Sequence, residues 1–375
     1  MVLLIGNYAP DQQQSMQRFN AMMLQGLIAA GVDAELIRPQ PIFGQLNLLG
    51  QFAAKWLGYI DKYILFPIQL KRKLRARPEV VHICDHSNAV YVKRCRRFSV
   101  LVTCHDLLAV RGALGEETDC PASFTGRILQ RWILRGLQRA DAVACISEAT
   151  ADDADRLIGH GVGRPHISVV RMGLNYPYKK LPTEVARVRL GKLDHFNCDF
   201  PFALHVGSNL RRKNRDGVLR IFAKCREKWN GRLVFAGDLL NEDLLTLAGE
   251  LGIADRVIQL HNPESEVLEI LYNCATALIY PSRFEGFGWP IIEAQACGCP
   301  VICTNSGPLP EAAGDAGFLH RVEDEDGFAT DLLRLTNPTK RAIWSEGSLR
   351  HAEKFSTDKM IAQYLDIYRH LGAEL

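Results

Sequence analysis

The chain has 375 residues, of which 47% are hydrophobic and 23% are charged. This composition excludes a wholly disordered chain, and at roughly 150 residues per domain the length predicts two domains. No apolar stretch reaches the ~18 residues that indicate a transmembrane helix. The first residues lack the features of a secretory signal, and the eleven cysteines include no Cys-x-x-Cys pair. We therefore expect a protein of the reducing cytoplasm.

Positive charge is concentrated in one part of the sequence. Residues 41–140 hold sixteen lysines and arginines against seven aspartates and glutamates, a balance of +9 in a chain whose formal net charge is +3. The surplus includes two clusters: Lys71, Arg72, Lys73, Arg75 and Arg77, and then Lys93, Arg94, Arg96 and Arg97. Such a surface favours an anionic neighbour, which could be lipid headgroups, nucleic acid or an acidic glycan. A solvated helix face explains the charges equally well.

Short apolar runs alternate with helical periodicity through the first half of the chain. Residues 2–5 form a compact apolar run that is typical of a buried parallel strand. Apolar residues then recur at helical spacing from Phe19 to Ala30, and Gly31 follows where a helix C-terminus favours glycine. Further strands are predicted at 34–37, 80–84, 100–103, 142–146 and 167–170. The alternation predicts βαβ units and a doubly wound parallel sheet.

A break in the alternation predicts the boundary between two domains. Residues 171–200 contain two prolines and many charges, and we interpret them as a linker. Strands resume at 202–206, 233–236, 257–260, 277–280 and 301–304. The sequence therefore predicts an α/β fold in which two Rossmann-like domains face each other across a ligand-binding cleft.

Residues 46–75 form an apolar segment that is rich in aromatic side chains and lies beside the first basic cluster. A helix with this pattern can lie in the interface of a membrane. The same pattern also describes a core helix of the first domain. In either case Pro67 is expected to break or kink the helix.

The segment 280–311 carries the residues that indicate a ligand site. A predicted strand leads into a loop with Glu285, Gly286 and Gly288. The glycines let the backbone approach a ligand, and the next helix directs its positive end to a place where phosphate is favoured. Glu293 follows Glu285 after seven residues, and the two carboxylates could accept hydroxyl hydrogen bonds from a sugar and from a ribose. As isolated residues they would be interpreted as ordinary loop and helix acids.

A basic segment follows the strand predicted at 202–206. Arg211, Arg212 and Lys213 lie between the end of this strand and a helix that is predicted to begin near Asp216. At this position a diphosphate would be neutralised, by arginine as a fork and by lysine as a point charge. A solvated basic loop is the alternative interpretation.

Together these segments resemble the retaining glycosyltransferases of family 4, which have the GT-B fold. Glu285 and Glu293 match the Glu-x7-Glu signature of that family, and the surrounding residues from 281 to 311 follow its usual order. The resemblance implies three parts. These are an N-terminal acceptor-binding domain at 1–178, a C-terminal nucleotide-sugar-binding domain at 179–355, and a C-terminal helix at 356–375 that crosses back to the N-terminal domain.

The resemblance also implies roles for individual residues. The donor would be bound by Gly207, Arg211, Arg212, Lys213, Gly286, Phe287, Gly288 and Glu293, of which Glu293 would hold the nucleotide ribose. The catalytic residues would be His105 beside the donor sugar, Glu285 at the sugar hydroxyls, and Asp106, which would orient the histidine or contact the acceptor.

The chain departs from the family pattern at two places. Many members have an arginine where this chain has Ser208, and a Gly-Gly pair where this chain has residues 11–16 without glycine. The first departure leaves open whether Arg211 or Arg212 supplies the guanidinium.

The activity that the resemblance implies is the transfer of a hexose from a UDP- or GDP-sugar to a glycan or lipid-linked acceptor in cell-surface polysaccharide or glycolipid synthesis. The anomeric configuration would be retained through a same-face, ion-pair-like displacement. The nucleotide sugar would be a co-substrate, and no metal or other cofactor is expected. The expected partners are this donor, this acceptor and an anionic membrane surface at the inner face of the membrane, without nucleic acid.

Other functions stay open at this stage, among them a GT-B-fold epimerase or phosphorylase and a non-catalytic nucleic-acid-binding protein. An NAD-dependent oxidoreductase is disfavoured because the first strand is not followed by Gly-x-Gly-x-x-Gly. Two acidic runs, at 153–155 and 323–326, resemble metal motifs but are predicted to be acids at helix starts. Cys297, Cys299 and Cys303 are predicted to be buried free thiols.

Overall fold

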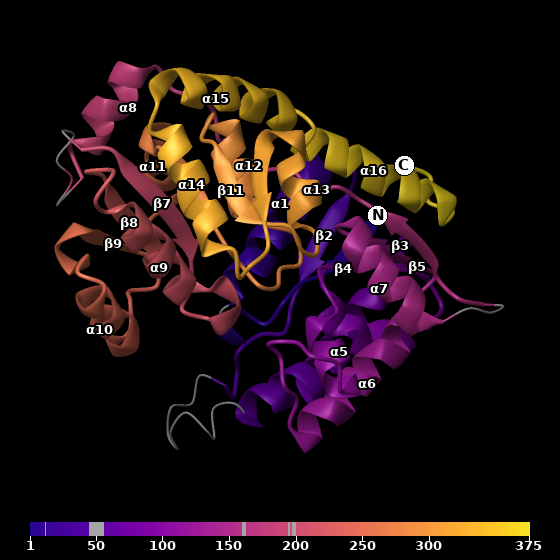
Figure 1. Cartoon of the computed structure of the whole chain (residues 1–375). Helices are drawn as coiled ribbons and strands as arrows, with labels where there is room; N and C mark the ends of the chain where they lie inside the picture. Colours follow the sequence, from indigo (N-terminus) through magenta and orange to yellow (C-terminus); the bar gives the residue numbers. More distant parts are fainter. Residues whose placement is uncertain (12, 45–55, 160–162, 194–195, 197–199) are drawn as a thin grey trace. The chain divides into compact units, whose positions relative to one another are not determined.

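The computed structural model describes residues 1–11, 13–44, 56–159, 163–193, 196 and 200–375. Its contacts divide the chain into two compact units (Figure 1). Unit 1 comprises residues 1–175 and 357–375, and unit 2 comprises residues 176–356. Each unit contains one six-stranded parallel sheet, which confirms the predicted α/β class and the two Rossmann-like halves.

The four central strands of unit 1 are buried, as expected for a parallel sheet with helices on both faces, whereas the edge strands β2 and β6 are only partly buried. The six strands pair in the order β2-β1-β3-β4-β5-β6. Their bounds are β1 (Val2–Ile5), β2 (Ala34–Ile37), β3 (Val80–Ile83), β4 (Ser99–Cys104), β5 (Ala142–Cys145) and β6 (His166–Val169). Every strand predicted in this half is present, with ends that differ by at most one residue.

The α-helices of unit 1 are α1 (Gln14–Ala29), α3 (Phe66–Lys73), α4 (Val92–Cys95), α5 (Leu108–Leu114), α6 (Phe124–Leu137), α7 (Glu148–Ile158) and α16 (Thr357–His370). The 3-10 turns are η1 (Ala9–Asp11), η4 (Leu74–Ala76) and η5 (His86–Tyr91). Gly31 has a φ of 81° just after α1, so the glycine ends this helix as predicted.

The segment predicted as a helix over 46–75 is helical from residue 56 onward, and its first part lies outside the described residues. A π-helical turn, η3 (Asp61–Leu65), separates residues 56–60 from α3. Pro67 sits in the first turn of α3, where a missing N–H costs little. The break expected at Pro67 therefore takes the form of a widened turn just before it.

In unit 2 the strands pair in the order β12-β11-β10-β7-β8-β9. Their bounds are β7 (Phe202–Gly207), β8 (Arg232–Gly237), β9 (Val257–His261), β10 (Ala277–Tyr280), β11 (Val301–Thr304) and β12 (Gly317–His320). The first five were predicted, and β12 was not.

The helices of unit 2 are α8 (Thr183–Leu190), α9 (Arg215–Cys225), α10 (Glu242–Glu250), α11 (Ser265–Cys274), α12 (Trp289–Ala296), α13 (Leu309–Ala313), α14 (Glu325–Leu335) and α15 (Pro338–Ala352), with 3-10 turns η6 (Arg211–Lys213), η7 (Ala254–Arg256) and η8 (Gly314–Ala316). The interpretation of 171–200 as a linker is wrong in part. This stretch includes α8, which buries Ala186 and Leu190 and packs against α11.

The last helix belongs to unit 1 although unit 2 precedes it in the sequence. Figure 1 shows α16, in yellow, beside strands of unit 1. The Tyr368 hydroxyl lies 2.7 Å from Nδ1 of His82, whose Nε2 lies 2.7 Å from Oγ1 of Thr103. The Tyr364 hydroxyl lies 2.9 Å from the same Thr103 oxygen. This buried chain of hydrogen bonds fixes α16 on the sheet at one position.

Candidate functional site

Each sheet has a point at which its strand order reverses, and ligands of open α/β sheets bind outside the carboxyl ends of the strands at such points. In unit 2 the reversal lies between β7 and β10, and in unit 1 it lies between β1 and β3. Most of the residues singled out in the sequence follow β7 and β10, and His105 and Asp106 follow β4 of unit 1.

In unit 2 the structure brings Arg212, Lys213 and Glu285 together. One carboxylate oxygen of Glu285 lies 2.6 Å from Nη1 of Arg212, and the other lies 2.7 Å from Nζ of Lys213. The Tyr280 hydroxyl, at the end of β10, accepts a hydrogen bond from Lys213 at 2.6 Å and donates one to Glu285 at 2.9 Å. We call these four residues the Glu285 cluster.

Burial and charge act in opposite directions on the pKa values of the Glu285 cluster. Burial alone would raise the pKa of Glu285, but the charges of Lys213 and Arg212 outweigh it and lower this pKa to about 2. Burial lowers the pKa of Lys213, against the opposing effect of Glu285. Glu285 is therefore ionised at neutral pH, and its charge is shared between two cations.

The two candidate arginines differ in their surroundings. Arg212 is partly buried in the Glu285 cluster and also donates to the backbone oxygen of Phe284, whereas Arg211 is exposed. A third arginine at this edge, Arg215, was missed in the sequence. It is buried, donates to the backbone oxygens of Gly207 and Asp238, and its pKa is lowered to about 10 by burial.

The carboxyl end of β7 is closely packed around Gly207. A side chain at this position would come within 3.3 Å of Lys213 and 3.4 Å of Nε2 of His205. His205 is fully buried, and its Nδ1 lies 2.9 Å from the backbone oxygen of Ile279. Its Nε2 has no hydrogen-bond partner among the described residues. Glycine at 207 therefore leaves room for the side chains that line this edge.

The glycine loop and α12 follow the Glu285 cluster in the sequence. Gly288 has a φ of 110° and directly precedes α12, so its conformation favours glycine. The Phe287 ring is buried and packs edge to face on Phe355, with 5.8 Å between centroids. Glu293 lies in the second turn of α12, where it is buried and accepts a hydrogen bond from the Tyr272 hydroxyl at 2.9 Å.

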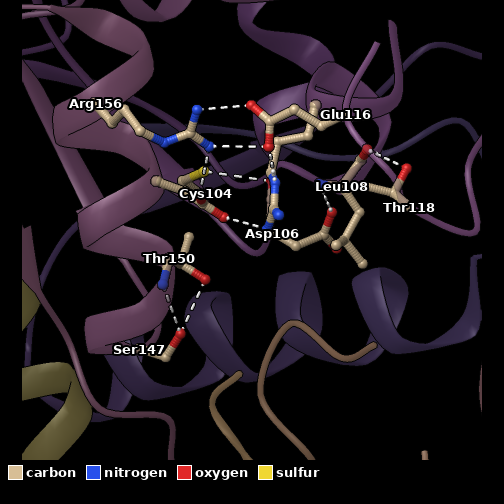
Figure 2. Close-up of polar contacts among 10 residues, drawn as sticks. Cys104, Asp106, Leu108, Glu116, Thr118, Ser147, Thr150 and Arg156 are labelled. Carbon is tan, nitrogen blue, oxygen red and sulfur yellow. Dashed lines mark hydrogen bonds and ion pairs between the residues drawn. The ribbon is translucent and has the colours of Figure 1, made fainter. Parts of the chain in front are cut away.

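In unit 1 the residues His105 and Asp106 have different partners. Nε2 of His105 lies 2.9 Å from the backbone oxygen of Cys84. Burial lowers the pKa of His105 although the nearby Asp85 opposes this shift, so its ring is neutral at pH 7. Figure 2 shows that Asp106 turns to the start of α5, where its carboxylate accepts from the Leu108 N–H at 3.1 Å.

A buried group at the strand-order reversal of unit 1 was not predicted. Asp85, just after β3, accepts hydrogen bonds from Asn7 at 2.5 Å and from the Ser87 hydroxyl at 2.6 Å. Nδ1 of His86 lies 3.1 Å from the Asp85 carboxylate. Burial acts to lower the pKa of His86, but its interactions with Asp85 and the charge of Asp106 together outweigh burial and raise this pKa. The only sequence signal was a polar run directly after an apolar strand.

The metal-like motifs have other structural partners. Among the described residues no group of three or more His, Cys, Asp or Glu side chains is arranged to hold a metal ion. Asp153 lies inside α7 and pairs with Arg111 and Arg156, which corrects its expected place at a helix start; Ser147 is the N-cap of α7. Asp324 is the N-cap of α14, as predicted for the second run. Cys297, Cys299 and Cys303 are buried free thiols, as predicted.

No helix in the described part of the chain is long and apolar enough to span a membrane.

Known protein families match both halves of the chain. Residues 194–349 match the family described as "Glycosyl transferases group 1". Residues 16–176 match the family described as "Glycosyltransferase Family 4". Together the two matches cover the Glu285 cluster and every strand of both sheets except β1.

Individual proteins agree with these families. The chain is 29% identical over 252 residues to O-antigen chain mannosyltransferase B of Escherichia coli, and the match covers 65% of each chain, less than two thirds of that relative's length. The sucrose-phosphate synthase of Thermosynechococcus elongatus superposes with a TM-score of 0.77 at 20% identity, over 99% of this chain and 98% of that chain. HepE of Anabaena, solved in complex with UDP, gives a TM-score of 0.74 at 16% identity, over 99% of this chain and 100% of that chain. At identities of 20% and 16%, the similarity to these two solved structures shows the fold alone.

Proposed function

Because the chain belongs to the family 4 glycosyltransferases and has the GT-B fold, we propose that it transfers a hexose from a nucleotide diphosphate sugar to a glycan or lipid-linked acceptor. We further propose UDP or GDP as the nucleotide, retention of the anomeric configuration, and a role in making cell-surface polysaccharide or glycolipid. The relative named for O-antigen chains supports the role in polysaccharide synthesis, and the UDP complex of HepE supports UDP as the nucleotide.

The observation that carries the proposal is the Glu285 cluster at the strand-order reversal of unit 2. A diphosphate needs cations that are fixed in place, and Arg212 and Lys213 are held within 2.7 Å of a shared carboxylate. A sugar needs hydrogen-bond acceptors for its hydroxyls, and Glu285 is ionised. The N-terminal end of α12 follows Gly288 and would add backbone N–H groups for the same anion.

Donor binding would redistribute the charges within the Glu285 cluster. Without donor, the single negative charge of Glu285 is shared between Arg212 and Lys213, so one positive charge is left over. A diphosphate carries more negative charge than one carboxylate and would attract both cations. Glu285 would then accept hydrogen bonds from the sugar hydroxyls in exchange for part of its ion pairing.

In the proposed reaction the bond between the anomeric carbon and the diphosphate oxygen breaks, and its electron pair leaves with the diphosphate. The acceptor hydroxyl oxygen forms the new bond to the anomeric carbon from the same face. The acceptor proton passes to the departing phosphate oxygen. Arg212 and Lys213 would stabilise the charge that develops on the leaving group, and the ionised Glu285 would hold the sugar as it becomes cationic.

The remaining predicted residues enter as parts of the same proposal. The amides of Phe287 and Gly288 would bind sugar hydroxyls, and Glu293 would bind the ribose. His105 would act as a neutral hydrogen-bonding group, because burial lowers its pKa. We assign no metal to the reaction, since side chains would supply the cations at the diphosphate.

Nucleotide binding tests the donor assignment. We expect UDP or GDP to raise the melting temperature of the full chain, and NAD at the same concentration to leave it unchanged. Lys213→Met should abolish that shift. Lys224→Met is the matched control, because Lys224 pairs with Asp326 at the surface of the same unit. Equal melting-temperature shifts with NAD and UDP would disprove this donor site. A full melting-temperature shift with UDP in Lys213→Met would also disprove it.

Turnover tests the transfer itself. Nucleotide release from a panel of UDP- and GDP-sugars should be slow alone and should rise with an acceptor glycan, and NMR of the product should show retained anomeric configuration. Glu285→Gln should lower turnover by a factor of about 10² or more, on the scale of a lost electrostatic contact in the transition state. An inverted product would disprove the retaining mechanism.

A further inference from the structure

A buried tyrosine donates a hydrogen bond to each acid of the Glu-x7-Glu pair. The Tyr280 hydroxyl donates to Glu285 and the Tyr272 hydroxyl donates to Glu293, and both distances are 2.9 Å. Both tyrosines are fully buried, and they come from different elements, β10 and α11. Tyr280 belongs to the Glu285 cluster. Tyr272 lies outside this cluster and contacts the second acid.

The ring of Tyr272 is held between α11 and the first residues of unit 2. It packs edge to face on the buried ring of Tyr178, with 5.8 Å between centroids. Asn273, the next residue of α11, accepts from the backbone N–H of Leu181 at 2.8 Å and donates to the backbone oxygen of Lys179 at 2.9 Å. These contacts fasten the segment that carries Tyr178 to α11. The Tyr272 hydroxyl is therefore kept in one place.

The Tyr272 hydroxyl is a lasting donor at neutral pH. Burial raises the pKa of Tyr272 well above its ordinary value, and the charge of Glu293 adds to this shift. A protonated phenol that faces a carboxylate donates its hydrogen to it. Oε2 of Glu293 thus has a fixed donor, and this bond restrains the rotation of the carboxylate about the last bond of the side chain.

The orientation of a carboxylate decides whether it can hold a ribose. The two ribose hydroxyls are neighbours on one ring, so both can donate only to a carboxylate that is turned toward them. The last torsion of a glutamate side chain is loosely restricted by itself. A carboxylate has about four positions that accept hydrogen bonds, and one bond from a tyrosine does not fill it. A fixed donor can therefore orient the acid and still leave it able to bind a diol.

Packing alone does not explain an acid at position 293. Its neighbours on α12, Ile292 and Ala294, are fully buried and apolar. Burying a carboxylate costs free energy that an apolar side chain at the same position would not cost. A phenylalanine and a leucine would fill the space of Tyr272 and Glu293 without polar atoms. The polar pair has a use that this apolar pair lacks, which is to bind the hydroxyls of a ligand.

We propose that Tyr272 is a positioning residue that orients Glu293 for the two hydroxyls of the donor ribose. Tyr272 itself contacts neither the donor nor the reacting atoms, and it acts through Glu293. The inference rests on the proposed function, because it requires a nucleotide sugar whose ribose lies at Glu293. It goes further in assigning the discrimination between a ribose and a deoxyribose to a pair of residues.

Nucleotides that differ only in the ribose test the proposal. The full chain is titrated with UDP and 2′,3′-dideoxy-UDP, and with the two corresponding guanosine nucleotides, by calorimetry. For the base that binds, the wild type should prefer the ordinary nucleotide roughly a hundredfold, at about tenfold per hydroxyl bound to a carboxylate. Tyr272→Phe keeps the ring, and it should reduce this preference by about tenfold. Its affinity for the dideoxy nucleotide should equal that of the wild type.

Turnover of the donor sugar gives a second measurement. The ribose is bound in the same way before and during bond cleavage, so a weaker ribose contact raises KM and spares kcat. Tyr272→Phe should raise the KM for the donor about tenfold and change kcat by less than about twofold. A large fall in kcat at an unchanged KM would contradict a role at the ribose.

Two further variants make the result specific. Tyr176→Phe is the matched control, since it removes a hydroxyl from a partly exposed ring that contacts Tyr178 in the same unit. It should leave the preference and both kinetic constants unchanged. Tyr178→Leu removes the ring that supports Tyr272 and should lower the preference by a smaller factor. If Tyr272→Phe does not fold, an unchanged preference in Tyr178→Leu overturns the proposal.

The results separate failure of this proposal from failure of the donor site. Equal weakening of the ordinary and the dideoxy nucleotide in Tyr272→Phe would make Tyr272 a residue of the fold alone. No preference in the wild type would show that Glu293 does not hold the ribose, although binding of UDP or GDP would keep the donor site. Binding of neither UDP nor GDP would overturn the donor site and this inference together.

Discussion

Nη1 of Arg212 lies 2.6 Å from Oε2 of Glu285. The group proposed to bind the leaving diphosphate is therefore neutralised, before any donor is present, by the group proposed to bind the sugar. This pairing allows a buried lysine and a partly buried arginine to stay charged next to each other. It also makes Glu285 a structural residue as well as a proposed catalytic one, and the two roles can be measured separately.

Glu285→Gln should destabilise unit 2 by about 3 kcal/mol, because it leaves Lys213 buried without its counter-charge. Urea unfolding followed by fluorescence measures this loss. Glu325→Gln is a suitable comparison, since Glu325 pairs with Arg220 at 2.5 Å in a more exposed place and should cost no more than about 1 kcal/mol. Equal losses in the two variants would show that the Glu285 cluster contributes little to folding.

The contribution of Glu285 to stability should depend on pH in a defined window. Its pKa is about 2 in the folded chain against an ordinary value of 4.5, so the unfolded chain takes up the proton first as the pH falls. The stability difference between the wild type and Glu285→Gln should be complete above about pH 5. It should shrink as the pH falls toward 2. Unfolding free energies measured at several pH values would test this, and a difference that grows on acidification would contradict it.

Asp85→Asn should lower the pKa of His86. In the wild type the carboxylate 3.1 Å from Nδ1 raises this pKa above the ordinary 6.5, whereas burial alone would lower it. Titration of the His86 ring by NMR gives both values. Asp106→Asn should have a smaller effect, because Asp106 acts on His86 only through its charge at longer range. A His86 pKa that is unchanged in Asp85→Asn would disprove the pairing.

Tyr368→Phe should loosen α16. The variant leaves Nδ1 of His82 buried without its hydrogen-bond partner, a loss of about 1–3 kcal/mol. Hydrogen exchange should become faster at the amides of α16, and the melting temperature should fall. Tyr59→Phe removes a hydroxyl from a partly exposed ring of the same unit and should change neither measurement. Unchanged exchange in Tyr368→Phe would show that the packing of α16 does not depend on this polar chain.

Most of the fold could be predicted because parallel strands buried on both faces are short apolar runs. β12 was missed since it is an edge strand in which Phe318 is buried and Leu319 is partly exposed, so no apolar run marks it. Helix α8 was missed for a similar reason, because it buries only Ala186 and Leu190 along eight residues. Marginal elements take their structure from neighbours that are distant in sequence.

The site was predictable only where a motif marked it. The sequence brought attention to Arg212, Lys213 and Glu285, and the structure places them in one cluster. No sequence pattern indicated that Asn7, in the loop after β1, contacts Asp85, because the two residues are 78 positions apart.

The return of α16 to unit 1 has a consequence for the order in which the protein is made. During translation, residues 176–356 leave the ribosome before the helix that covers His82 and Thr103 exists. A nascent chain can thus complete unit 2 while the unit that emerged first still lacks one of its layers. A stop codon after residue 356 would spare every strand of both sheets and yet leave the older unit unfinished.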